Sequence, residues 1–256
     1  GWSMPFSHAT LPDDWVALLR VGGALEPCGV GLRSRVRFSS LGDADLMMHS
    51  AYPTVEADAV FFGPDTFRFV RLLRDRVASA RTCVDVGCGS GAGGLALRDR
   101  VEQVIMADIN PQALRFATIN AALAGCTQAR IAESDVLRSV AAPVDLVVAN
   151  PPYIVDPGAR LYRNGGGSRG TGLAERIVRE GLDRLGSGGR LVLYTGVPIV
   201  AGRDVLRAAL APLLAAKGAR YTYEELDPDV FGEELEGDAY GDVERIAVVG
   251  LDARLP

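Results

Sequence analysis

Short runs with strand character alternate with helical segments from about residue 82 to residue 251, and this alternation is the strongest constraint on the fold. Predicted strands cover residues 82–86, 103–107, 129–132, 144–149, 190–194, 220–225 and 243–251. Predicted helices cover residues 92–100, 111–124, 173–185 and 200–216. This pattern predicts an α/β fold with a mostly parallel sheet between two layers of helices. The last two strands have no helix between them, so we expect them to pair antiparallel.

The first 60 residues lack this alternation. Pro12–Arg20 is a predicted helix, and Val30–Phe38 is a predicted strand. Three apolar residues are predicted to face inward from that helix, namely Trp15, Leu18 and Leu19. We expect residues 1–60 to form a small cap over the carboxyl edge of the sheet, on the substrate side. The α/β domain then covers residues 61–256 and begins with a helix over residues 67–78.

The sequence Asn150-Pro151-Pro152-Tyr153 directly follows the predicted strand 144–149. Consecutive prolines end a strand, because neither has an N–H for the ladder and each fixes its own φ. The carbonyls of Asn150 and Pro151 then lack sheet partners at the end of the strand, where open α/β sheets bind ligands. Two acceptors beside a flat ring suit a planar –NH2 group, so we predict all four residues as catalytic. The alternative is a simple strand stop with an Asn cap.

A glycine-rich loop follows the first predicted strand, with the sequence Asp85-Val86-Gly87-Cys88-Gly89-Ser90-Gly91. Glycines suit this position because the turn is tight and a ligand must approach the backbone without meeting a Cβ. The G-x-G-x-G spacing differs from the strict dinucleotide pattern G-x-G-x-x-G. The loop alone is therefore weak evidence for a cofactor site.

Two further carboxylates strengthen this prediction. Asp108 ends the second strand, where an acid can accept hydrogen bonds from ribose hydroxyls. Asp135 follows the third strand and can meet an adenine amino group while Val136 covers the ring. Each has a simpler interpretation, since Asp108 can cap the next helix and Asp135 can be a turn residue. All these strand ends nevertheless share one crevice.

Composition excludes several other classes of protein. No apolar run approaches the length of a membrane span, which predicts no membrane partner. Four cysteines without a C-x-x-C pair favour a reducing cytoplasm, and two isolated histidines predict no metal site. The net charge of −5 disfavours a nucleic-acid partner, although Arg160, Arg163 and Arg169 lie close together. The acidic residues within 227–238 are most simply a solvated face.

Taken in order, the glycine loop, Asp108, Asp135 and Asn150-Pro151-Pro152-Tyr153 resemble the class I S-adenosylmethionine-dependent methyltransferases, over about residues 61–251. The tetrapeptide looks like that of the amino-methylating branch, and Pro64-Asp65-Thr66 looks like the release-factor glutamine methyltransferases. The resemblance implies a seven-stranded doubly wound sheet in the order 3-2-1-4-5-7-6, with strand 7 antiparallel. It also implies S-adenosyl-L-methionine as the cofactor, bound by Asp85, Gly87, Cys88, Gly89, Ser90, Gly91, Asp108, Ile109, Asp135, Val136 and Asn150.

Three features depart from the pattern of the release-factor enzymes. Gly63 and Phe67 stand where those enzymes usually carry Arg and Glu. The N-terminal segment lacks their long helical bundle, and the acidic loop at 227–242 is longer than a tight hairpin needs. The departures concern the acceptor and leave the predicted chemistry unchanged.

The resemblance therefore predicts an N-methyltransferase acting on a planar amide or amino nitrogen of a protein or a small molecule. A methyltransferase of exocyclic base amines in RNA or DNA is the alternative, and it requires a flipped or single-stranded base. A dinucleotide oxidoreductase would make no use of Asn150-Pro151-Pro152-Tyr153, and a non-catalytic binding protein would not need it either. No feature of the sequence names the acceptor or the oligomeric state.

Overall fold

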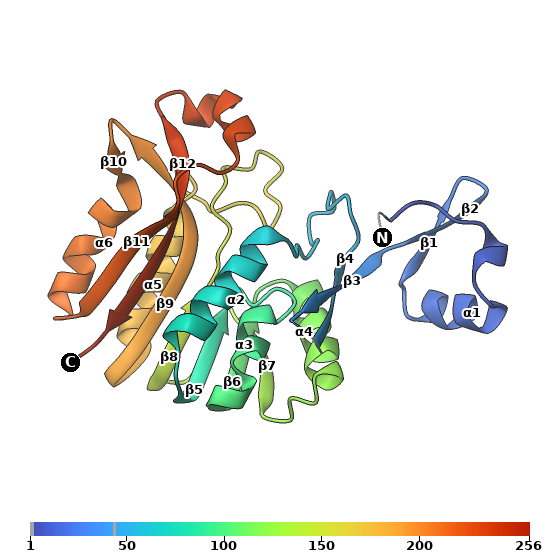
Figure 1. Ribbon diagram of the computed structural model, residues 1–256, viewed down its shortest axis with the longest axis horizontal. Helices are drawn as coiled ribbons and strands as arrows, with labels where there is room; N and C mark the ends of the chain where they lie inside the picture. The colour runs from blue at the N-terminus through green and yellow to red at the C-terminus, as the bar shows by residue number, and fades with distance from the viewer. Residues whose placement is uncertain (1–2, 43–44) are drawn as a thin grey trace.

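The predicted sheet is present in the computed structural model, which describes residues 3–42 and 45–256 (Figure 1). Its strand order is β7-β6-β5-β8-β9-β12-β11, which is the predicted order 3-2-1-4-5-7-6. Only β12 runs antiparallel to its neighbours in this path. The strands are β5 (Ala80–Val86), β6 (Val101–Asp108), β7 (Ala129–Glu133), β8 (Val144–Ala149), β9 (Leu185–Val200), β11 (Arg220–Asp227) and β12 (Arg245–Arg254).

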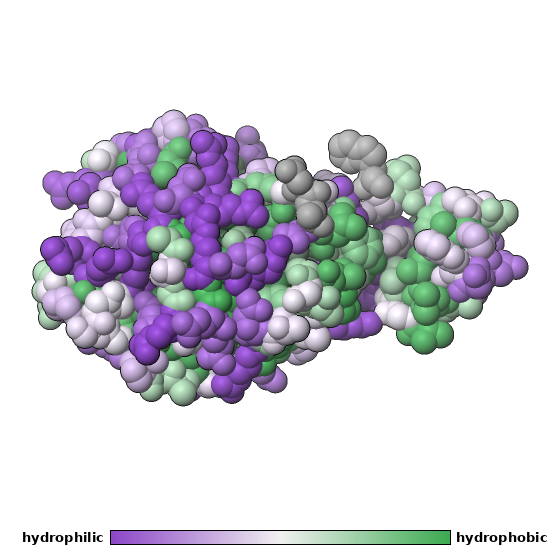
Figure 2. All heavy atoms as spheres, turned by 60° about the horizontal axis from the view of Figure 1, so that its bottom comes forward, coloured by the Kyte–Doolittle hydropathy of each residue, from purple (hydrophilic) through white to green (hydrophobic). Residues whose placement is uncertain are grey.

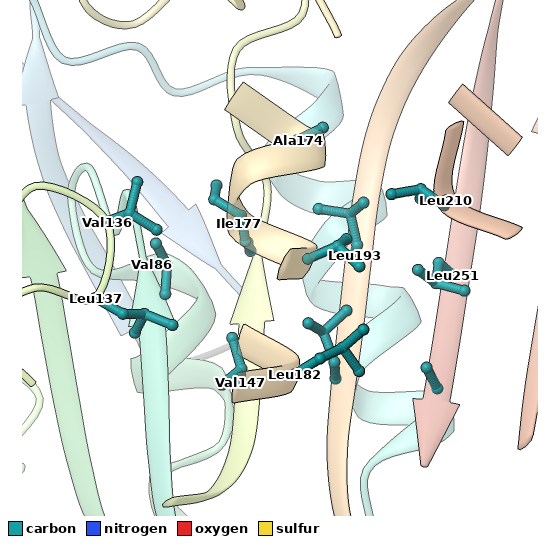
Figure 3. Close-up of a cluster of buried hydrophobic side chains, with 14 of the residues drawn as sticks. Val86, Val136, Leu137, Val147, Ala174, Ile177, Leu182, Leu193, Leu210 and Leu251 are labelled. Carbon is teal, nitrogen blue, oxygen red and sulfur yellow. The ribbon is translucent and has the colours of Figure 1, made fainter. Parts of the chain in front are cut away.

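Helices cover both faces of this sheet, as predicted. Alternate strand residues point to opposite faces, so Val84 and Val86 pack on one side and Cys83 on the other. The first face is covered by α5 (Gly172–Arg184) and α6 (Val205–Ala216), and Figure 3 shows their side chains packed against the strands. The second face is covered by α2 (Pro64–Arg76), α3 (Ala92–Ala96) and α4 (Pro111–Leu123). Apolar side chains dominate both faces, which fits a sheet buried on both sides.

The order of strands reverses between β5 and β8. These strands are parallel neighbours, paired from Cys83–Leu146 to Val86–Ala149. The chain continues outward in one direction to β6 and β7 and in the other direction to β9. A crevice opens at the carboxyl ends of the strands at such a reversal. The glycine loop follows β5 and the Asn150 segment follows β8, so the topology places both at this crevice.

Three predicted elements have markedly different bounds in the structure. The helix predicted over 92–100 ends at Ala96, and residues Arg98–Arg100 form the 3-10 turn η2. The strand predicted over 190–194 extends from Leu185 to Val200, and the helix predicted from residue 200 begins at Val205. The β-branched residues near Val200 favour a strand. β9 extends past the end of β8 after Leu193. Pro198 lies in this extension, so its missing N–H does not cost a hydrogen bond to β8. The short β10 (Arg203–Asp204) folds back on this extension.

The N-terminal region forms a small lobe with two hairpins. The first hairpin pairs β1 (Leu25–Cys28) with β2 (Gly31–Ser34), and the second pairs β3 (Val36–Leu41) with β4 (Asp45–Ser50). The predicted strand 30–38 is therefore split between two hairpins, and the split falls at Arg35. The helix α1 (Asp13–Val21) is present after the 3-10 turn η1 (His8–Thr10), and both lie with β1 and β2 at the end of the molecule far from the sheet (Figure 1).

The predicted inward face of α1 was wrong for Trp15 and Leu18, and Leu19 is half-buried. Trp15 is 60% exposed and Leu18 is 72% exposed, whereas the neighbouring Val16 is buried. Helical spacing shows which residues share a face but not which face another element covers. Figure 2 shows this lobe as a projection with apolar side chains on its surface, next to a largely hydrophilic sheet domain. None of the helices within 3–42 and 45–256 has the length and apolar character needed to cross a membrane.

Candidate active site

The glycine loop joins β5 to α3 in a tight turn. Gly87, Gly89 and Gly91 have φ values of 66°, 54° and 84°, a region that strongly favours glycine. The N–H groups of Gly87 and Cys88 both donate to the carbonyl of Ala107, which fastens the loop to β6. A Cβ on Gly91 would lie 2.8 Å from the sulfur of Met106, so Gly91 allows α3 to approach the sheet. A Cβ on Gly87 would instead stand in open space.

Asp85 lies beneath this loop and is 1% exposed. Its Oδ2 accepts a hydrogen bond from the Gly94 N–H at 2.8 Å, near the start of α3. Burial raises the pKa of this carboxyl to about 7, although the bond from Gly94 acts in the opposite direction. A Cβ on Gly93 would lie 2.9 Å from the same carboxylate, so the glycine pair at 93–94 allows the close approach.

This raised pKa predicts that stability depends on pH. The folded protein holds the Asp85 proton more tightly than the unfolded chain, so the free energy of unfolding should fall as pH rises from about 4 to about 7. The expected fall is on the order of 4 kcal/mol. Urea denaturation between pH 4 and pH 8 measures it. Asp85→Asn should reduce the slope, whereas Asp75→Asn, on the surface of α2, should leave it unchanged; an equal slope in both variants would contradict the prediction.

Asp108 ends β6 and also contacts the glycine loop. Its Oδ2 accepts from the Gly89 N–H at 2.9 Å, and its Oδ1 accepts from the Asn110 N–H at 2.9 Å. Burial raises the pKa of this carboxyl as well. The cap of α4 is Asn110, whose side chain accepts from the Gln112 N–H at 2.9 Å, so Asp108 is not the helix cap. Each carboxylate oxygen keeps a lone pair for a further donor.

Asp135 and Val136 follow β7. Asp135 accepts a hydrogen bond from Arg176 at 2.6 Å and lies 3.2 Å from Arg138, and the Arg176 bond is the main reason that the pKa of this carboxyl is lowered. Val136 has φ of 57°, which is unusual for a β-branched residue and indicates local strain. Its side chain packs in the same cluster as Val86 (Figure 3). Because its pKa is lowered, the Asp135 carboxyl stays ionised at the edge of the crevice.

The segment Asn150–Tyr153 leaves the end of β8 as predicted. Among the described residues, neither the Asn150 side chain nor the Pro151 carbonyl has a hydrogen-bond partner. Both residues line a cavity of about 210 Å³ at the carboxyl ends of β5 and β8. The cavity brings together every predicted site residue except Gly91, namely Asp85, Gly87, Cys88, Gly89, Ser90, Asp108, Ile109, Asp135, Val136, Asn150, Pro151, Pro152 and Tyr153. Two residues with free acceptors therefore border the same space as the glycine loop.

Other residues of the site were not predicted. Asn120 is fully buried in α4; its side chain donates to the carbonyls of Met48 and Ser90 and accepts from the Met48 N–H. It thereby ties the second hairpin to the glycine loop. Phe61 and Tyr162 border the cavity and stack with centroids 5.8 Å apart. These contacts join segments distant in sequence, and no local pattern indicates them.

Aromatic side chains pack at Gly63 and Phe67, the two positions around Pro64-Asp65-Thr66 that depart from the release-factor enzymes. Pro64 starts α2, and the Thr66 hydroxyl accepts from the Gly63 N–H at 3.2 Å. A Cβ on Gly63 would lie 2.4 Å from the Phe61 ring, so a larger residue there would displace this ring from the cavity border. Phe67 packs edge-on against Phe62 at 5.2 Å.

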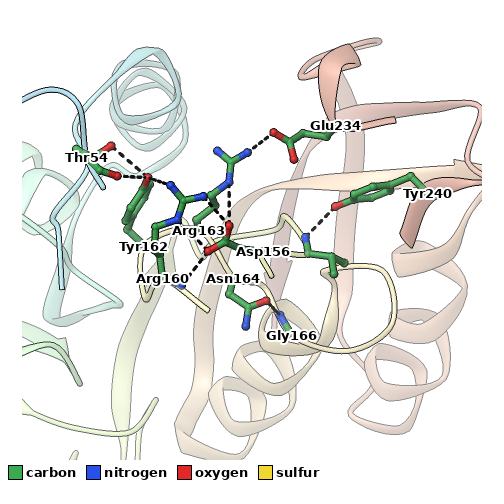
Figure 4. Close-up of polar contacts among 10 residues, drawn as sticks. Thr54, Asp156, Arg160, Tyr162, Arg163, Asn164, Gly166, Glu234 and Tyr240 are labelled. Atoms are coloured by element: carbon green, nitrogen blue, oxygen red, sulfur yellow. Dashed lines mark hydrogen bonds and ion pairs between the residues drawn. The ribbon is translucent and has the colours of Figure 1, made fainter. Parts of the chain in front are cut away.

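The loop that follows Tyr153 is held by charged residues (Figure 4). Asp156 accepts from Arg160 and contacts Arg163, and its bond from Arg160 lowers the pKa of this carboxyl to about 2. Arg163 also pairs with Glu234, and Arg169 pairs with Asp242. The acidic loop, with the 3-10 helices Gly232–Glu236 and Asp238–Tyr240, therefore braces this segment and is not only a solvated face. All three clustered arginines are paired with carboxylates.

The chain is similar to several methyltransferases. It matches the methyltransferase small domain over residues 65–201. A release factor glutamine methyltransferase of Deinococcus radiodurans is 32% identical over 200 residues, which cover 71% of this chain and 66% of the relative. A tRNA1(Val) (adenine(37)-N6)-methyltransferase of Aeromonas hydrophila is 35% identical over 119 residues, which cover 43% of this chain and 48% of that protein. The crystal structure of M. jannaschii TYW2 in complex with AdoMet has a TM-score of 0.59 at 13% identity, covering 86% of this chain and 85% of that one, and shares the fold. The chain spans less than two thirds of the length of these two curated relatives.

Proposed function

Since the chain belongs to the methyltransferase small domain family, we propose that it is an S-adenosylmethionine-dependent N-methyltransferase acting on a planar amide or amino nitrogen. The main support is the pair of free acceptors at the end of β8, on Asn150 and Pro151, which line one cavity with the glycine loop. A planar –NH2 group has two donors for these two acceptors. An oxidoreductase or a passive binding protein would have no use for this pair.

The residues of the cavity fit S-adenosylmethionine. Glycine at position 87 leaves open space where any side chain would project toward a ligand. The Asp108 carboxylate keeps lone pairs for ribose hydroxyls, and the ionised Asp135 can accept from an adenine amino group. Ile109 and Val136 also line the cavity and can offer apolar surface to the adenine ring. When bound, the cofactor supplies a methyl group on a sulfonium.

Asn150 and Pro151 orient the acceptor. The nitrogen of an amide or aryl amine is a poor nucleophile, because its lone pair is delocalised into the planar group. Asn150 Oδ1 and the Pro151 carbonyl accept its two hydrogens and so direct its lone pair along a fixed line. Holding reactants in an attack geometry can supply on the order of 7–11 kcal/mol of the barrier. Tyr153 forms the wall beside this position and offers a flat surface to the acceptor plane.

No side chain of the site needs to act as a base. Burial and the neighbouring Asp65 raise the pKa of Tyr153, so its phenol stays protonated. The acceptor nitrogen becomes acidic only after it gains the methyl group. Its proton can then leave to water or by way of Asn150.

A protein amide or a small molecule is the favoured acceptor. The three clustered arginines, Arg160, Arg163 and Arg169, are each paired with a carboxylate, and the net charge is −5. We also propose residues 1–60 as the substrate-side segment, since Ala59 and Val60 line the cavity beside Phe61. The four free cysteines fit the proposed cytoplasmic, reducing environment.

Isotope transfer tests the proposed function. Labelled S-adenosylmethionine is incubated with the protein and a cell extract, and the product is separated into protein, nucleic acid and small metabolites. Label on nitrogen in any fraction supports the proposal, whereas no transfer to any fraction despite cofactor binding would reject it.

The same separation tests a second candidate, methylation of an exocyclic base amine, which the similarity to an adenine-N6 methyltransferase favours. Label in RNA or DNA, together with nucleic-acid binding that weakens steeply as the salt concentration is raised, would show that the acceptor is a nucleic acid and not a protein.

A further inference from the structure

Asp65 joins two tyrosines across the active site. It lies at the start of α2, 88 residues before Tyr153, and its Oδ2 accepts the Tyr153 hydroxyl at 2.5 Å. Its Oδ1 accepts the hydroxyl of Tyr194, from β9, at 3.0 Å. Hydrogen bonds to an ionised carboxylate are roughly twice as strong as neutral ones. One carboxylate therefore ties the segment after β8 to the neighbouring strand.

The charge of Asp65 is partly offset by a nearby arginine. Arg68, one turn later on α2, lies 3.9 Å from Asp65 Oδ1 and pairs with Asp227 at 2.9 Å. The Tyr194 side chain is fully buried, and Tyr153 is 7% exposed. The carboxylate is therefore satisfied by two phenols and a guanidinium group, and no further partner is needed to hold it in place.

The face of the Tyr153 ring is fixed by a glycine. A Cβ on Gly196, in β9, would lie 2.2 Å from the Tyr153 Cδ2 and 2.3 Å from its Cε2. The ring therefore lies directly on the backbone of β9, and any side chain at position 196 would displace it. Phe231 contacts the edge of the ring, with centroids 5.9 Å apart. Asp65 holds the hydroxyl of the same tyrosine.

We propose that Asp65 is a positioning residue, which sets the Tyr153 ring beside the acceptor nitrogen by binding its hydroxyl together with that of Tyr194. This inference rests on the proposed function, because it gives Tyr153 the role of an acceptor wall. Asp65 acts through Tyr153 and not on the cofactor. Its loss should therefore lower kcat and leave the dissociation constant of S-adenosylmethionine nearly unchanged.

The test is Asp65→Asn, with Asp75→Asn as the matched control. The control makes the same charge change in the same helix, at an exposed carboxylate whose one ion pair among the described residues is with Arg71 at 3.9 Å. We expect Asp65→Asn to lower kcat roughly 10- to 100-fold, since a displacement of about 1 Å can have this effect. Tyr153→Phe should give a similar loss, and the double variant should be no worse than the single ones. Calorimetry with S-adenosylmethionine should show the same affinity in all of them.

A second measurement does not depend on activity. With 3-fluorotyrosine incorporated, the ¹⁹F resonances of Tyr153 and Tyr194 can be assigned by their loss in the Phe variants. Both should move in Asp65→Asn and stay in place in Asp75→Asn. Unchanged resonances and kcat in Asp65→Asn would overturn the inference, and so would a weakened cofactor affinity with kcat unchanged. If the wild-type protein transfers no methyl group, the proposed function fails, and the ¹⁹F shifts still decide whether Asp65 positions Tyr153.

Discussion

Replacing Asn150 with alanine should lower kcat by roughly 10²- to 10³-fold, which is the usual effect of removing one hydrogen-bonding group that orients a reacting atom. The substitution removes Oδ1, one of the two free acceptors at the end of β8. The acceptor nitrogen then keeps only the Pro151 carbonyl, and its lone pair is no longer directed. Single-turnover assays with labelled S-adenosylmethionine measure the loss, and calorimetry should show cofactor affinity within a few-fold of wild type.

Two controls separate this effect from damage to the fold. The Asn150 side chain has no hydrogen-bond partner among the described residues, so its removal should change stability by less than about 1 kcal/mol. Asp108→Ala should show the reverse pattern, with weaker cofactor binding as the main effect. A near-wild-type kcat in Asn150→Ala would reject the assigned role of Asn150.

The carboxyl ends of β5 and β8 were predictable from the sequence because local chemistry marks them. Consecutive prolines end β8 whatever surrounds them, and glycines at 87, 89 and 91 indicate positive φ. The parallel strands β5, β6, β7 and β8 each contribute one short motif at or after their last residue, and the topology brings these motifs to one edge. The predicted order of strands was confirmed, although that order came from the family resemblance and not from the periodicity.

The contacts that hold the site were not predictable in the same way. Asp65 and Tyr153 are 88 residues apart, and nothing near either residue indicates the other. Asn120 in α4 has no sequence signal that distinguishes it from a surface asparagine, yet it is fully buried. The face of α1 was wrong for the same reason, because amphipathic spacing cannot identify the neighbouring element. The glycines at 165, 170 and 196 do carry a partial signal, since glycine often marks a close backbone approach.

Gly165→Ala is expected to reduce turnover as strongly as a change of a catalytic residue, although position 165 has no side chain. The glycine-rich segment 164–170 lies directly against Pro152 and Tyr153, and the Gly165 N–H donates to the Ile154 carbonyl at 2.8 Å. A Cβ on Gly165 would lie 1.9 Å from the Gly170 carbonyl oxygen and 2.7 Å from that of Pro152. These atoms belong to the backbone, so the clash can be relieved only if one of the two segments moves.

We expect this movement to displace the Pro151 carbonyl and Tyr153, to lower kcat roughly 10²-fold and to destabilise the protein by about 1–3 kcal/mol. Gly166→Ala is the matched control. Gly166 has φ of 69° and no atom within 4 Å of its added Cβ, so alanine there costs only about 1–2 kcal/mol of backbone strain. Steady-state kinetics and urea denaturation of both variants separate the two effects. Equally lowered kcat values in the two variants would show that strain in the loop, and not contact with the Asn150–Tyr153 segment, controls turnover.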